Sequence, residues 1–121
     1  MKFSLFFTMA LAAATPLLLS AGEADVIDVR VKQGSEDTYT FQVAVAHGDS
    51  GWEHYADKWD IVSSDGTILG TRVLHHPHVD EQPFTRNLSG VEIPPGTKKV
   101  SVRAHDSVHG YGGKTMSVQL P

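Results

Sequence analysis

The sequence contains no cysteine. This absence excludes disulfide bonds, metal sites built on thiolates and a cysteine nucleophile. An exported form of the chain must therefore draw its stability from its core, helped by any metal that it binds.

Basic side chains are scarce as well. The chain holds 10 Lys and Arg against 14 Asp and Glu, and one of the basic residues, Lys2, belongs to the N-terminal segment. Nucleic acids select basic surface patches, so this acidic balance argues against a nucleic-acid partner. The sequence also lacks internal repeats, low-complexity segments and any convincing apolar pattern with the 3.6-residue period of a helix.

The one long apolar run stands at the N-terminus. Lys2 supplies a positive charge, residues 3–19 carry none, and small residues follow, among them Ala21 and Ala24. This order is typical of a secretory signal peptide, whereas an uncleaved membrane anchor is disfavoured by the short run. We predict a signal peptide over residues 1–21, with cleavage after Ala21 or Ala24, and one domain over residues 22–121. The protein would be periplasmic or secreted, without stable membrane association after cleavage.

Short segments of alternating apolar and polar residues fill the rest of the chain. They cover residues 27–31, 39–45, 55–61, 67–74, 84–91, 100–104 and 116–120. Such alternation is typical of β-strands with one buried face, and Asp65-Gly66 is a hairpin turn sequence. The pattern assigns Ile27, Tyr55 and Trp59 to the core. Seven strands with a tryptophan on the third predict an all-β fold, a seven-stranded immunoglobulin- or fibronectin-like antiparallel sandwich.

All seven histidines fall between residues 47 and 109. Strands that alternate in direction place every second connection at the same end of a sandwich, and the connections after the second, fourth and sixth strands contain or border every histidine. Imidazole is the commonest protein ligand for zinc, copper and iron, and carboxylates in the same connections add oxygen ligands. The topology therefore predicts a metal site on the loops at one pole.

Two motifs in these loops resemble those of a known family. The segment His47–Tyr55 (HGDSGWEHY) leads into WDIV and Asp65-Gly66, and the segment Asp106–Tyr111 reads DSVHGY. The first resembles the histidine loop of desulfoferrodoxin and neelaredoxin, the superoxide reductases. The second resembles the Cys-Asn-x-His-Gly motif of that family, with Asp106 in the place of the cysteine.

The resemblance implies an immunoglobulin-like sandwich and a ligand set of His47, His54, His109 and Asp106. The thiolate of the family is absent, and no histidine precedes His47 to supply a further ligand. An axial ligand sets much of the redox behaviour of a metal. We therefore expect a metal-binding protein related to superoxide reductase rather than the reductase activity; as an enzyme, it would be a metal-dependent oxidoreductase of that type.

These observations predict an exported protein that holds one transition metal ion (iron, copper or zinc) through those four residues. Seven further residues at the same pole are auxiliary ligands or binding residues: His75, His76, His78, His105, Glu53, Trp52 and Tyr111. Two alternatives stay open. A remoter resemblance to SoxZ-type sulfur carriers implies a non-catalytic module that binds a periplasmic protein partner through the same pole. A relic that has lost its site would keep the histidines as solvated loop residues.

Overall fold

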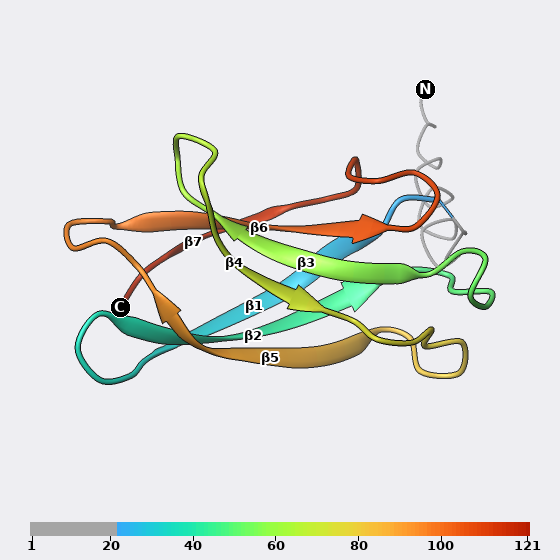
Figure 1. The fold of residues 1–121 in the computed structure, drawn as a ribbon, viewed down its shortest axis with the longest axis horizontal. Helices are drawn as coiled ribbons and strands as arrows, with labels where there is room; N and C mark the ends of the chain where they lie inside the picture. Colours follow the sequence, from blue (N-terminus) through green and yellow to red (C-terminus); the bar gives the residue numbers. More distant parts are fainter. Residues whose placement is uncertain (1–21) are drawn as a thin grey trace, which may run out of the picture.

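Seven strands form two antiparallel sheets in the part of the chain that the computed structural model describes, residues 22–121. The strands are β1 (Asp25–Gln33), β2 (Thr38–Ala46), β3 (Ala56–Val62), β4 (Ile68–Val73), β5 (Phe84–Glu92), β6 (Lys99–Asp106) and β7 (Met116–Gln119). One sheet has the order β1-β2-β5 and the other β4-β3-β6-β7, and Figure 1 shows the two as separate layers. The predicted all-β sandwich is confirmed.

The predicted signal peptide, residues 1–21, lies outside the described residues. Within residues 22–121 no helix has the length and apolar character that a membrane span requires.

The core lies between the two sheets. Its largest side chains are Trp59, Phe41, Phe84 and Ile61, each at most 1% exposed. Burial of apolar surface is the main favourable contribution to folding, and aromatic side chains contribute most per residue. The predicted core position of Trp59 is confirmed, and Met116 packs against the same cluster from β7.

Two β-bulges overturn the predicted core positions of Ile27 and Tyr55. The pairing of β1 with β2 skips Ile27, which is 46% exposed, and buries its neighbour Val26 instead. The pairing of β3 with β6 skips Asp57, so Ala56 rather than Tyr55 takes the inward position. A bulge inserts one unpaired residue and so reverses the alternation on one side of it. A strict two-residue period was therefore the wrong assumption at both places.

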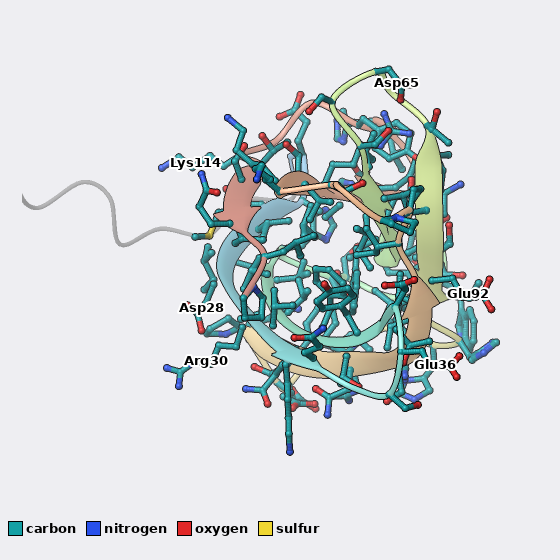
Figure 2. The ribbon with its side chains drawn as sticks, turned by 90° about the vertical axis from the view of Figure 1, so that its left-hand side faces the viewer. Asp28, Arg30, Glu36, Asp65, Glu92 and Lys114 are labelled. Atoms are coloured by element: carbon teal, nitrogen blue, oxygen red, sulfur yellow. The ribbon has the colours of Figure 1, made fainter. Side chains whose placement is uncertain are left out.

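The sandwich has two different ends. The connections after β2, β4 and β6 gather at the right-hand end in Figure 1, as the topology predicted for the histidines. We call this end the histidine pole. Figure 2 looks at the molecule from the opposite end, where the labelled Glu36, Asp65 and Glu92 lie at the periphery. No histidine belongs to the connections of that end.

The bulge in β1 makes two neighbouring substitutions unequal. Val26→Ala should lower the free energy of unfolding by about 2 kcal/mol, because it removes fully buried methyl groups. Ile27→Ala should cost less than about 1 kcal/mol, because that side chain is half exposed. Urea unfolding of both variants measures the difference. Equal losses, or a larger loss at Ile27, would show that β1 follows the strict alternation after all.

Candidate metal centre

The Asp106 carboxylate lies at the centre of the histidine pole and is fully buried. Its Oδ2 accepts hydrogen bonds from the backbone N–H groups of Val108 and His109, at 3.1 and 2.9 Å. It also lies 2.9 Å from His54 Nε2 and 3.1 Å from His109 Nδ1. Burial alone would raise the pKa of Asp106, but these N–H donors hold it below the usual value. Asp106 is therefore an anion that joins two histidines from different loops.

The second oxygen of Asp106 is different. Oδ1 is buried and has no hydrogen-bond partner within residues 22–121. A buried carboxylate oxygen without a donor carries a desolvation cost that nothing offsets. A cation next to Oδ1 would remove that cost.

His47 is the most buried histidine, at 1% exposure, and a contact with Asp49 orients its ring. Its Nδ1 lies 2.5 Å from Asp49 Oδ1, which leaves Nε2 turned to the other side. Burial by itself would lower the pKa of His47, but the hydrogen bond and charge of Asp49 outweigh it and raise the pKa above 6.5. A carboxylate behind one ring nitrogen is how metal-binding histidines are usually oriented.

Three of the four predicted ligands, His47, His54 and Asp106, come together, and the fourth, His109, lies next to them. Donor atoms of His47, His54 and Asp106 all lie within 4.8 Å of one another. The His54 ring centroid is 4.8 Å from that of His47 and 4.9 Å from that of His109. His109 stands at the outer side of this group, with 38% of its side chain exposed.

This donor set fits a transition metal. Imidazole nitrogens with one carboxylate suit zinc, oxidised copper or ferrous iron, and Oδ1 of Asp106 has no hydrogen-bond donor within residues 22–121 that would compete with such an ion. A bound ion would act as a Lewis acid or redox centre there. The residues themselves orient the rings and exclude water from two of the three converging groups.

Two side chains tie the connection after β2 to the connection after β4. The carboxylate of Asp49 accepts hydrogen bonds from the backbone N–H groups of Ala56 and His78, at 3.0 and 2.7 Å. Gln82 accepts from the N–H of His47 and donates to the carbonyl of His78, both at 3.0 Å. The loop that carries His47 is therefore held from two directions.

His78 does not join the group around Asp106. Its ring stacks on Phe84 with centroids 4.0 Å apart, and neither ring nitrogen has a partner within residues 22–121. Burial, followed by the charges of Arg86 and His76, lowers its pKa below 6.5. His75 and His76 are exposed on the same connection, although the His76 ring lies 4.8 Å from that of His78.

His105 and Tyr111 lie on the outer face of the four-stranded sheet. His105 Nδ1 is 2.6 Å from Asp57 Oδ1, and its ring packs edge-on against Tyr111. Tyr111 donates a hydrogen bond to the buried Asp60, which also accepts from Arg103. These side chains hold the loop after β6 against the sheet. His105, predicted as an auxiliary residue, pairs with Asp57 and not with the four predicted ligands.

The remaining predicted residues lie on the surface of the pole. Trp52 is 66% exposed and packs edge-on against Tyr55, while Glu53 accepts a hydrogen bond from Ser50. Neither contacts the group around Asp106 in the described contacts.

Sequence reasoning gave no specific role to Asp49 or Gly22. Asp49 follows His47 by two residues, and a His-x-Asp pair is a signal that could have indicated an orienting carboxylate. The carbonyl oxygen of Gly22 lies 2.8 Å from His47 Nε2. A backbone group leaves no signal in composition or spacing, so only the structure reveals it.

Comparison with known proteins agrees on the fold and leaves the activity open. No protein-family model matches the chain. A protein of Halomicrobium mukohataei that carries the name lipoprotein is 42% identical over 100 residues, which is 83% of this chain and 49% of that protein. The chain thus spans about half the length of the curated relative that it matches.

Two solved structures share the architecture. The protein PH1083 of Pyrococcus horikoshii has a TM-score of 0.52 at 15% identity, and an oxidised superoxide reductase has a TM-score of 0.50 at 13% identity. Each comparison covers 82% of this chain and 89% of the other. The predicted resemblance to superoxide reductase is therefore confirmed for the fold, while the resemblance to SoxZ stays a prediction.

The two buried histidines predict a stability maximum near neutral pH for the metal-free protein. His47, whose pKa is raised, contributes stability that is present below pH 6.5 and lost as the pH rises through its folded pKa. His78, whose pKa is lowered, makes the protein less stable as the pH falls below 6.5. The free energy of unfolding, measured by urea titration in chelator, should therefore be highest near pH 6.5.

The acid side of this profile can be assigned by one variant. His78→Phe keeps the stack on Phe84 and removes the two unpartnered nitrogens, so it should stabilise the protein by about 1 kcal/mol and flatten the profile below pH 6.5. His75→Ala, at an exposed position of the same loop, should leave the profile unchanged. A loss of stability between pH 6.5 and about pH 4 that persists in His78→Phe would contradict the assignment. The loss at lower pH belongs to carboxylates such as Asp106, whose pKa lies below its usual value of 3.8.

Proposed function

We propose that the chain is an exported protein that holds one transition metal ion at the histidine pole, with His47, His54, His109 and Asp106 as ligands. The observation that carries the proposal is the buried, unpartnered Oδ1 of Asp106 beside two imidazoles. The hydrogen bonds to Oδ2 do not offset the desolvation of Oδ1, which has no donor within residues 22–121. The desolvated carboxylate is better explained by a cation that it binds.

The donor chemistry favours zinc, oxidised copper or ferrous iron. The set lacks the thiolate that the resemblance to superoxide reductase would require, because the sequence contains no cysteine. We therefore propose that the protein stores, carries or presents its metal and does not reduce superoxide. The fold that it shares with superoxide reductase supports the location of the site and leaves the metal open.

Export rests on the N-terminal pattern and on the relative named lipoprotein. A periplasmic or secreted location follows from a cleaved signal peptide. Lipids attached through a thiol need a cysteine, and these 121 residues contain none. The lipid implied by the name of the relative is therefore not carried over to this chain.

A second candidate function is a non-catalytic interaction module at the same pole. Trp52 and Val108, 66% and 57% exposed, place apolar surface beside the histidines. Exposed tryptophan is enriched at protein interfaces. A periplasmic protein partner would then contact the pole whether or not metal is bound.

Metal content tests the first candidate directly. The protein, purified without a histidine tag and without chelator, should contain about one equivalent of iron, copper or zinc by elemental analysis. At a free metal concentration a hundred times the Kd, binding stabilises the fold by about 2.7 kcal/mol. The melting temperature should therefore rise by on the order of 10 °C when metal is added to chelated protein.

Asp106→Asn is the matching variant. The amide keeps an oxygen for the N–H groups of Val108 and His109, but it removes the negative charge and the free lone pairs of Oδ1. We expect loss of bound metal and of the melting shift, and the same for His54→Ala. His75→Ala is the control and should bind as the wild type does.

The result also separates the two candidates. The metal function is wrong if the wild type holds no metal and its melting temperature responds to added iron, copper or zinc no more than those of Asp106→Asn and His54→Ala do. The pole would then be a protein-binding surface, and substitution of Trp52 rather than of the histidines would be the next step.

A further inference from the structure

The backbone of Gly22, a residue that was not among the predicted ligands, contacts the candidate metal centre. Its carbonyl oxygen lies 2.8 Å from His47 Nε2. Nδ1 of the same ring is engaged by Asp49, so Nε2 is the nitrogen that His47 can offer to a metal. The carbonyl oxygen of Gly22 therefore faces the ring nitrogen that a metal would bind.

The position of Gly22 is built into the fold. Residues 22–26 lie along the end of the loop that follows β6: the N–H of Val26 donates to the carbonyl of Lys114 at 2.8 Å, and the N–H of Lys114 donates to Asp25 Oδ1 at 2.7 Å. A Cβ on Gly113 would overlap the carbonyl of Ala24, so the two segments approach as closely as glycine allows. Ala24, 1% exposed, anchors the segment in the core.

The Gly22 oxygen and the free ring nitrogen of His47 lie close enough together to be ligands of one ion. They are 2.8 Å apart, and two ligands that each lie 2.0–2.1 Å from an ion are at most about 4.2 Å apart. Carbonyl oxygens from the backbone are known ligands beside imidazole, usually as weaker ones.

We propose that the carbonyl oxygen of Gly22 is a ligand of the metal, so that the segment following the predicted signal peptide completes the site. This inference rests on the proposed function. It gives the cleavage position a chemical meaning: cleavage after Ala21 keeps the ligand, whereas cleavage after Ala24 removes it. The position of signal-peptide cleavage would thus determine whether the carbonyl oxygen of Gly22 is among the ligands of the metal.

Carbon-13 labelling tests the ligand without disturbing it. The exported protein, recovered from cells grown with glycine labelled at the carbonyl carbon, is loaded with Cu²⁺ and examined by pulsed electron–nuclear double resonance. The labelled wild type should show a ¹³C coupling that the unlabelled protein lacks. Gly22→Ala, prepared with the same labelled glycine, keeps the backbone carbonyl but loses the label at that position. Compared at equal amounts of bound Cu²⁺, the variant should lack the coupling.

Three results would overturn the proposal, and each points to a different error. Bound Cu²⁺ without ¹³C coupling, or with a coupling that persists in Gly22→Ala, would remove Gly22 from the ligand set and leave the metal site intact. A mass that shows a chain beginning at Asp25 would place the ligand in the removed peptide. Failure of the wild type to retain Cu²⁺, zinc or iron would contradict the proposed function itself.

Discussion

The histidine pole is organised by one buried carboxylate. Taking a carboxylate out of water costs several kcal/mol unless donors replace the lost hydration. At Asp106 one oxygen meets that need through two loop N–H groups and two imidazoles, and so fixes the loop after β6 to the loop after β2. The other oxygen is left unsatisfied. The carboxylate that orders the loops is therefore also the group whose second oxygen has no hydrogen-bond donor within residues 22–121.

Much of the fold could be read from the sequence, because alternation reports directly on burial. The seven strands and the buried Trp59 follow from that period and from the turn residues between strands. Ile27 and Tyr55 could not be placed, because a bulge depends on how two distant strands pair and leaves no local mark. The number of strands is thus a property of the pattern, while the face to which a single residue points depends on tertiary pairing.

The candidate site was predictable to the level of the pole and less so within it. Alternating strand direction brings His47, His54 and Asp106 to one end, and the resemblance to the superoxide reductase motifs singled them out. His78 and His105 share that end but face elsewhere, because Phe84 offers one a stacking surface and Asp57 offers the other a carboxylate. The direction of each histidine ring depends on the residues nearest to it in space, and spacing along the chain does not reveal these.

The links made by Asp49 and Gln82 have a consequence for motion. Each of these side chains hydrogen-bonds groups on both the β2–β3 and the β4–β5 connection. Ser107, on the β6–β7 connection, donates its N–H to the carbonyl of Tyr55 and accepts from the N–H of Tyr55 through its hydroxyl. Loops joined in this way cannot fluctuate one at a time without breaking bonds in their neighbours. The histidine pole is therefore expected to open as one cooperative unit, a local unfolding event with its own free energy, and not as three independently fraying loops. An ion held there would leave at the rate of that shared opening.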